Sequence, residues 1–412
     1  MPGAAGRPRG GAKRADPAIV PWRNGVIALY LASGLVLSTL VSRLPAVRDA
    51  LGLSHGEVGL LLLCMTAGSF ASVSVSGYLV MRLGSTRTVV LAATLTTVSL
   101  AAVGLSTAGL HSLVLTGVAL GLQGVGNASW NVSANVQGAA MERALGVSIM
   151  PALHGFFSVG TVMGAAAGAL GAVLDVPVSW HFAVVAAAVL VLIFAGTRVF
   201  RADPSNIGSG HSNKSLLAAA WREPRTLVLG ALVLGMALAE GAAGDWVALA
   251  LSDGYDAINS LGAIGYGIFV TAMTVARMGG GRVLERLGRV AVIRLSATST
   301  LAGLMLFVYG PNLYTAFAAL VFWGLGVAMS FPVAMSAASD DPLRAAARVS
   351  VVSTIGYGAF LGGPPLLGLL ADNLGLLNAL AFVGILVLAS FFLAPAAAPA
   401  KAAPRPTGTD ES

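Results

Sequence analysis

Two carboxylic acids stand inside one long apolar stretch, residues 226–250, which holds no other charged residue. If this stretch is a helix that starts near Arg225, a rise of about 1.5 Å per residue places Glu240 about 22 Å along it, near the middle of a bilayer core about 30 Å thick. Asp245 follows one to two turns later. An acid at this depth is costly and points to function, so both acids are candidates for carrying a proton. A protonated Glu240 that bonds to a neighbouring helix is the alternative.

A second group of side chains could bind a polar solute. Its members recur every four residues and share one side of a predicted helix; they are Gln123, Asn127, Asn131 and Asn135. Amides both donate and accept hydrogen bonds, and the nearby Trp130 offers a stacking face. Trp246, beside Asp245, is included in the expected substrate site. Polar residues in membrane helices also hold helices together, which stays the alternative for the amides.

The composition places these side chains in a membrane protein. Of 412 residues, 56% are hydrophobic and 10% are charged, against about 25% charged residues in ordinary soluble domains. Stretches of about 20 apolar residues, the length that crosses a bilayer, occur repeatedly. The twelve expected spans are 25–42, 57–81, 88–108, 111–136, 148–173, 180–199, 226–250, 261–284, 290–310, 312–336, 347–371 and 376–395.

Other function classes find no support in the sequence. The net charge of +7 comes from short basic clusters between apolar runs, and these clusters do not form a basic patch interleaved with aromatic residues, so nucleic acid is not an expected partner. Cys64 is the only cysteine, which excludes a disulfide or a cysteine metal site within one chain. The phosphate-binding and zinc-binding motifs are absent. We expect no enzymatic activity, no cofactor and no metal.

Charge also predicts the orientation in the membrane. With twelve spans, one side holds both chain ends and every Lys and Arg except Arg43 and Arg48, so both termini should be cytoplasmic. Arg43 could attract an anionic substrate or pair with Asp49 or Glu57. Arg277 lies close to the cytoplasmic end of its span, where its side chain can reach the interface.

The spans form two groups of six, separated by a polar connection rich in Ser, Asn, Gly and Lys. The predicted organisation is a disordered cytoplasmic tail over 1–23, a six-helix bundle over 24–200, a cytoplasmic linker over 201–225, a second six-helix bundle over 226–395 and a disordered cytoplasmic tail over 396–412.

One short phrase occurs in both halves of the chain. GYLVMRLG ends an apolar run at residues 77–84, and GRVLERLGR ends another at 281–289, an offset of 281 − 77 = 204 residues. The phrase therefore marks the same turn in two related halves, and repeated bundles in one membrane are typical of transporters. The residues expected in this gating loop are Gly77, Arg82, Gly84, Gly281, Glu285, Arg286, Gly288 and Arg289.

The phrase resembles the loop signature of the major facilitator superfamily, G-x-x-x-D-R-x-G-R-R. The second copy has Glu285 at the acidic position, whereas the first copy has Met81 there. Further phrases at 43–54, 240–246 and 356–365 resemble the YbjJ-like inner-membrane branch, near the fucose–proton symporters. The resemblance implies an all-α integral membrane fold with twelve transmembrane helices in two pseudo-symmetric six-helix bundles.

These observations together predict a secondary active transporter in the inner or plasma membrane. It would move a small polar solute, sugar-like or another metabolite, by alternating access, with Glu240 as the leading proton carrier. Proton-driven export of a drug or metabolite is the alternative within transport, and a non-transporting membrane receptor or scaffold is the alternative of another class. The expected partners are the solute, protons and the lipid bilayer, and the chain is expected to be a monomer.

Overall fold

The computed structural model describes residues 19–145, 149–200, 214–341 and 344–399, which form helices joined by short turns, with no strand among them. In chain order the helices are α1 (Ile19–Ser42), α2 (Leu44–Leu51), α3 (His55–Leu83), α4 (Ser85–Ala108), α5 (Leu113–Leu145), α6 (Met150–Val173), α7 (Val178–Thr197), α8 (Lys214–Ala220), α9 (Pro224–Gly254), α10 (Asn259–Tyr309), α11 (Leu313–Val327), α12 (Ser330–Ala338), α13 (Ala345–Leu374), α14 (Leu376–Leu393) and the 3-10 helix η1 (Ala394–Ala397).

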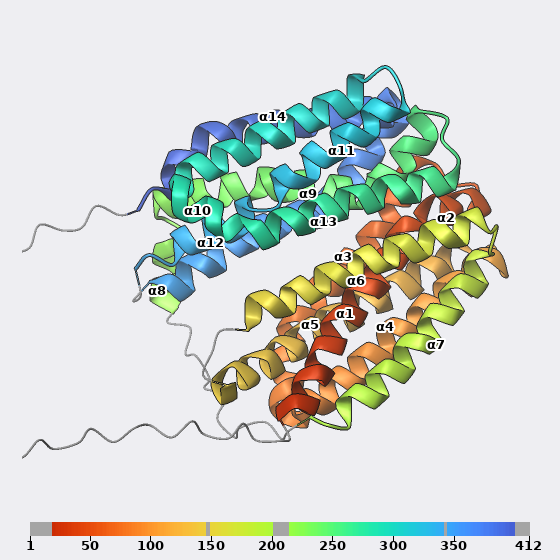
Figure 1. Ribbon diagram of the computed structural model, residues 1–412, viewed down its shortest axis with the longest axis horizontal. Coiled ribbons are helices and arrows are strands. Elements are labelled where there is room, and N and C mark those ends of the chain that lie inside the picture. The colour runs from red at the N-terminus through yellow and green to blue at the C-terminus, as the bar shows by residue number, and fades with distance from the viewer. Residues whose placement is uncertain (1–18, 146–148, 201–213, 342–343, 400–412) are drawn as a thin grey trace, which may run out of the picture.

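Each of the twelve predicted spans corresponds to a helix. Nine candidate membrane spans are found within the described residues by length and hydropathy. One of them, α10, has 51 residues and contains two helices that meet at Gly288, and another joins α11 to α12. The long helices α3 and α5 run between the same two ends of the molecule (Figure 1). The prediction of an all-α integral membrane fold is confirmed.

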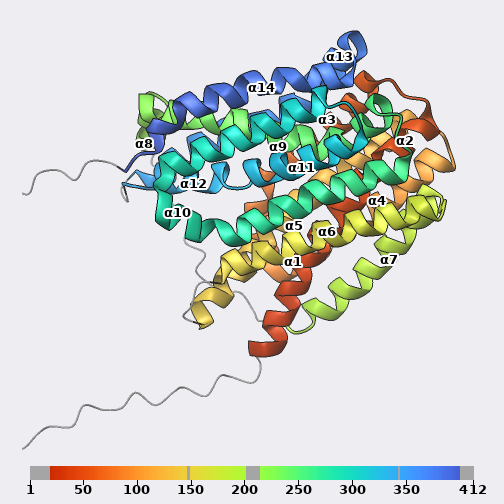
Figure 2. The same ribbon diagram turned by 45° about the horizontal axis from the view of Figure 1, so that its top comes forward.

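The helices gather in two groups, which Figures 1 and 2 show as a red-to-green group of α1–α7 and a green-to-blue group of α8–α14. One apolar core draws its buried members from α1–α7, and the other draws nearly all of its buried members from α9–α14 and η1. The α2 end lies at the right of Figure 1 and the α8 end at the left. The α2 end was expected to face outward and the α8 end to face the cytoplasm.

The repeat found in the sequence is also a repeat of backbone conformation. Gly84 joins α3 to α4 with φ 81° and ψ 156°, and Gly288 joins the two parts of α10 with φ 75° and ψ 167°. The two glycines are 288 − 84 = 204 residues apart, which is the offset of the repeated phrase. A positive φ of this kind is open to glycine and strained for other residues, so the same residue type is required at both turns.

Helix packing repeats as well. Gly124 lets α5 approach the backbone of α3 at Met65, and Gly324 lets α11 approach the backbone of α10 at Phe269. Phe269 follows Met65 by the same 204 residues. In both places a Cβ would collide with a backbone carbonyl oxygen, so each close contact depends on a small residue.

Some residues of the expected tails and linker are helical, and residues 1–18, 201–213 and 400–412 lie outside the described residues. Residues 19–23 of the expected tail belong to α1, and the Trp22 indole donates to Gln137 at 2.8 Å. Helix α8 and the start of α9 at Pro224 fall within the expected linker. Arg225 donates to the carbonyls of Ala396 and Ala398 at 2.9 and 2.7 Å and thereby orders the beginning of the expected tail.

Candidate functional site

The two predicted acids lie on α9, and one of them has a cationic partner. Arg277 of α10 donates from Nη2 to Oε1 of Glu240 at 2.7 Å, with both side chains partly buried. Arg277 therefore turns toward α9, and the expectation that it reaches the membrane interface is wrong. An arginine inside an apolar span is itself a signal for a buried partner, because a charge at this depth needs compensation.

Asp245 has a different environment. It lines a small cavity between α9 and α13 together with Gly241, Phe360, Gly363 and Pro364. No residue in the described part of the chain forms a hydrogen bond or an ion pair with its carboxyl group, although the side chain is only partly exposed. Protonation of Asp245 therefore breaks no ion pair within the described residues, whereas protonation of Glu240 would weaken its pair with Arg277.

Two aromatic residues lie beside these acids. Trp246 is fully buried in the core of the second half, and its indole nitrogen has no hydrogen-bond partner among the described residues. Tyr266 of α10 is buried and lies within electrostatic range of both Asp245 and Glu240. Sequence reasoning did not select Tyr266, because a tyrosine in an apolar run gives no signal of what it faces.

The amide stripe on α5 is divided by burial. Asn127, Asn131 and Asn135 are partly exposed. Asn131 donates to the carbonyl of Asn127 at 2.9 Å, and Asn135 accepts from the Tyr30 hydroxyl of α1 at 2.6 Å. The ring of His154 on α6 lies 5.4 Å from the Tyr30 ring. These contacts link polar groups of three helices in the first half.

Gln123 and Trp130 lie elsewhere on α5. Gln123 is 2% exposed and Trp130 is 0% exposed. Trp130 packs within the apolar core of the first half. The carbonyl oxygen of Gln123 and the indole nitrogen of Trp130 have no partner among the described residues. The structure thus separates these two side chains from the partly exposed asparagines.

Polar contacts join the two halves at the α2 end. Arg48 of α2 forms an ion pair with Asp253 of α9, which also lies 2.7 Å from Nε2 of His55 on α3. The opposite nitrogen of His55 lies 3.6 Å from Asp372 of α13. Asn259 donates to Asp49 at 3.1 Å. Burial alone would lower the pKa of Arg48, but hydrogen bonds to Asp253 and Asp49 outweigh it and raise the pKa.

Helices α3 and α13 approach each other closely beneath these contacts. The backbone N–H of Gly56 donates to Asp372 at 3.0 Å. One turn further along α3, a Cβ on Gly59 would lie only 2.7 Å from the carbonyl oxygen of Pro364. A Cβ on Gly368 of α13 would likewise lie only 2.6 Å from the carbonyl oxygen of His55. Polar pairs and glycine contacts together close the α2 end.

Arg43 has neither of its expected carboxylate partners. It is 6% exposed and donates from Nη2 to the carbonyl of Val176 at 2.7 Å, so pairing with Asp49 or Glu57 is ruled out in this structure. Burial lowers the pKa of Arg43, and the nearby Asp175 opposes this shift. The arginine holds the turn between α6 and α7 against the end of α1.

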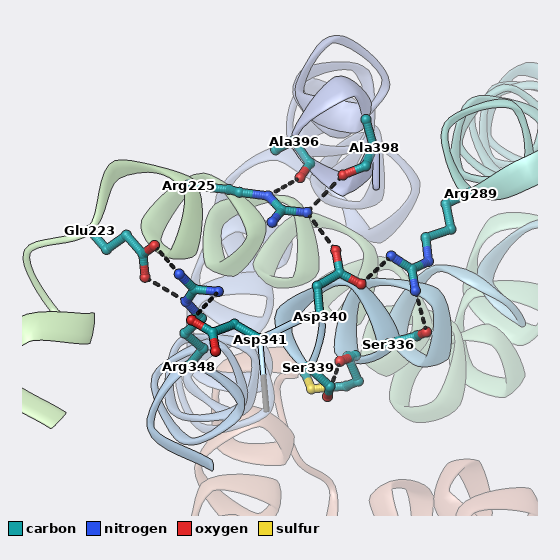
Figure 3. A network of polar contacts seen from close by, with 11 residues as sticks. Glu223, Arg225, Arg289, Ser336, Ser339, Asp340, Asp341, Arg348, Ala396 and Ala398 are labelled. Carbon is teal, nitrogen blue, oxygen red and sulfur yellow. Dashed lines mark hydrogen bonds and ion pairs between the residues drawn. The ribbon is translucent and has the colours of Figure 1, made fainter. Parts of the chain in front are cut away.

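The predicted gating loop residues lie at the α8 end and differ between the two copies. In the second copy, Arg289 pairs with Asp340 at 2.6 Å and donates to Ser336 at 3.1 Å (Figure 3). Glu285 and Arg286 are exposed, and neither has an ion-pair partner among the described residues. In the first copy, the Arg82 guanidinium lies 5.4 Å from the centre of the Tyr78 ring. The flanking glycines Gly77 and Gly281 have no neighbour within 4 Å at the Cβ position.

Figure 3 shows that Arg289 belongs to a larger charged network. Asp340 also accepts from Arg225 at 2.9 Å, and Arg348 of α13 pairs with Glu223. Burial alone would raise the pKa of Asp340, but hydrogen bonds from Arg289 and Arg225 outweigh it and lower the pKa. The ion pairs that join described residues at the α8 end all lie within the second half of the chain.

These features define a polytopic helical membrane protein with two repeated bundles and buried charged groups. Residues 26–357 match the Major Facilitator Superfamily, and the chain belongs to this family. It is a membrane transporter of this type, as the sequence resemblance predicted.

Relatives and solved structures agree with this family. The chain is 32% identical to an uncharacterized transporter, y4wD, of Sinorhizobium fredii, over 92% of this chain and 98% of that protein. It is 30% identical to the membrane protein MosC of Rhizobium meliloti, over 87% of this chain and 86% of that protein. A mutant form of the nucleoside transporter NupG has a similar fold, with a TM-score of 0.75 at 14% identity, covering 91% of this chain and 98% of that one. The Escherichia coli fucose:proton symporter FucP gives a TM-score of 0.62 at 14% identity, covering 93% and 100%.

Proposed function

We propose that this protein is a secondary active transporter that moves a small polar solute by alternating access, coupled to protons. The supporting observation is the contrast between its two ends. Polar pairs and glycine contacts join the halves at the α2 end, whereas the ion pairs between described residues at the α8 end stay within one half. With the α8 end in the cytoplasm, as the positive charges predict, this is an inward-facing state of a monomer in the inner membrane.

The proposed solute site uses the partly exposed amides of the first half. Asn127, Asn131 and Asn135 offer donors and acceptors along one helix of the first half, and Tyr30 adds a hydroxyl. Such a surface suits a hydroxylated solute. The solved relatives named for a nucleoside and for fucose carry solutes of this chemistry. Trp130 and Gln123 would support this wall from behind.

The proposed proton site is Asp245, with Glu240 and Arg277 as a charged pair beside it. Asp245 can bind a proton without losing an ion pair, because it has no partner within the described chain. The sequence made Glu240 the leading candidate for the proton carrier. Because Glu240 forms a 2.7 Å ion pair with Arg277, we assign the proton to Asp245 instead. The pair would compensate two charges at a depth where an isolated charge is costly.

The test begins with a thermal-shift screen of the purified protein against a library of hydroxylated metabolites. A hit is then assayed in proteoliposomes that contain a pH-sensitive dye. We expect Asp245→Asn to abolish solute-driven proton movement while solute exchange survives. Asp256→Asn, at an exposed carboxyl beyond the end of α9, is the matched control and should behave as wild type. Proton movement at the wild-type rate in Asp245→Asn would refute the proton assignment.

The solute site has its own test. Asn131→Leu should weaken binding of the hit at least tenfold, which is about 1.4 kcal/mol, without lowering the yield of folded protein. Asn378→Leu replaces an exposed asparagine of α14 and is the matched control. Loss of folded protein in Asn131→Leu alone, with unchanged affinity in what remains, would assign the stripe to helix packing.

A further inference from the structure

Two adjacent prolines interrupt the backbone hydrogen bonds of helix α13. Pro364 and Pro365 lie inside this 30-residue helix, ten and nine residues before its end at Leu374. Proline has no N–H group, so the carbonyls four residues earlier, those of Phe360 and Leu361, lose their helical donors. In a membrane such carbonyls are satisfied by other groups.

One of the two carbonyls belongs to a residue that lines the same cavity as Asp245. Phe360 and Pro364 line the small cavity that holds Asp245, whereas Leu361 is not among the residues that line it. Two glycines bring the helices together here. A Cβ on Gly241 of α9 would lie 3.1 Å from the Phe360 ring, and a Cβ on Gly363 would lie 2.7 Å from Leu238.

The opposite side of the same break takes part in closing the α2 end. The carbonyl of Pro364 and the backbone of Pro365 lie against Gly59 of α3. A Cβ on Gly59 would lie 2.7 Å from the Pro364 carbonyl oxygen and 3.2 Å from the Pro365 Cα. One turn of α13 therefore contacts the cavity of Asp245 on one side and the first bundle on the other. A change in the bend of this turn would alter both contacts.

We propose that protonated Asp245 donates a hydrogen bond to the free carbonyl of Phe360 and so holds the bend of α13 that packs against Gly59. This inference rests on the proposed proton site. When the proton leaves, the carboxylate has no hydrogen to donate and two oxygen acceptors face each other, which disfavours the bend. Proton binding at Asp245 and closure of the α2 end are then coupled, and each strengthens the other by the same factor.

Among the described residues, Tyr266 of α10 is a titratable group near Asp245, and Tyr266 also lies near Glu240 of α9, which pairs with Arg277. The side chains that α13 contributes to the cavity of Asp245 are all apolar. At the α2 end, the His55 imidazole lies against the carboxylates of Asp253 and Asp372 and is a second ionisable group in the contact between the halves. The experiment is therefore performed with His55→Gln as well as with the wild-type residue.

The test measures closure of the α2 end directly. The full-length protein, with Cys64 replaced by Ser, carries spin labels at Leu110→Cys and Tyr314→Cys, two exposed positions at this end on opposite halves. Distance distributions are recorded in nanodiscs at neutral and mildly acidic pH. We expect acid to raise the ratio of closed to open molecules about 2- to 12-fold, the range expected for one added hydrogen bond.

The two adjacent prolines provide a matched pair of variants. Pro364→Ala restores an N–H for the carbonyl of Phe360, so the acid effect should disappear. Pro365→Ala restores an N–H for Leu361 and should leave the acid effect in place. An acid effect that persists in both variants, or is lost in both, overturns the assignment of the Phe360 carbonyl.

Two substitutions of Asp245 separate this inference from the proposed function. Asp245→Asn keeps a hydrogen donor and should favour the closed state at both pH values, whereas Asp245→Leu should favour the open state at both. If Asp245→Asn blocks proton movement but does not change the distances, the coupling through α13 is wrong while the proton site stands. If neither distances nor proton movement depend on Asp245, both proposals fail.

Discussion

The contact between Gly59 of α3 and Pro364 of α13 gives the sharpest mutational prediction. In Gly59→Ala, the new Cβ would lie 2.7 Å from the Pro364 carbonyl oxygen, where ordinary contact begins at 3.4 Å. The helices must therefore separate by about 0.7 Å, or a neighbour must shift. The oxygen belongs to the backbone, so no flexible side chain can move out of the way. Overpacking of this size costs about 1–3 kcal/mol.

This cost applies only when the α2 end is closed, because the contact joins the two halves. The ratio of closed to open molecules should fall about 5- to 150-fold, which corresponds to that range of free energy. The change would appear in the distance distribution between labels at Leu110→Cys and Tyr314→Cys, and as increased labelling of cysteines at the α2 end.

The control is Gly358→Ala on α13, a helical glycine with nothing within 4 Å of its Cβ position. It gives the same gain in helix propensity without the collision and should leave the distances unchanged. Equal distances in Gly59→Ala and Gly358→Ala would refute the view that this close contact closes the α2 end.

Three further predictions concern charged groups. Arg277→Gln should lower the free energy of unfolding by about 1–3 kcal/mol, because Glu240 loses its partner; the loss is smaller than for a fully buried pair. The control Arg282→Gln, at an exposed site, should leave the free energy of unfolding unchanged. Thermal unfolding in detergent compares the two variants. Asp340→Asn should lower the free energy of unfolding by about 1 kcal/mol at neutral pH. The pKa of Asp340 is lowered in the folded state, so the difference in unfolding free energy between wild type and variant should shrink as pH falls through that pKa. A constant difference across a pH series would contradict the ion pairs. Arg48→Gln should open the α2 end, and unchanged label distances would show that its pair with Asp253 is not needed for closure.

The sequence was sufficient for the features that depend on length and order along the chain. Twelve apolar stretches predicted twelve helices, because a bilayer core of about 30 Å sets the length of a span. The repeated phrase predicted two related halves, and the glycines at 84 and 288 share one backbone conformation. Counting residues along one helix also predicted a depth for Glu240 and Asp245, and the structure confirms that both acids lie on α9.

The partners of polar groups followed only from the tertiary structure. Glu240 and Arg277 are 37 residues apart, and Arg48 and Asp253 are 205 residues apart, so each pair depends on how helices rotate and pack. Arg43 turns to a backbone carbonyl although two carboxylates lie nearer in sequence. The side chains of an apolar span are similar on every face of the helix. Hydropathy therefore does not predict how each helix is rotated about its own axis.

What the sequence determined by itself is the number of membrane spans, their division into two related halves and the presence of two acids within one apolar span. What the tertiary structure decided is which acid has a cation beside it, which acid faces the proline break of α13 and which end of the molecule is closed. The physical reason is that crossing a membrane is a property of each segment alone, whereas the environment of a buried charge is created by the neighbouring segments.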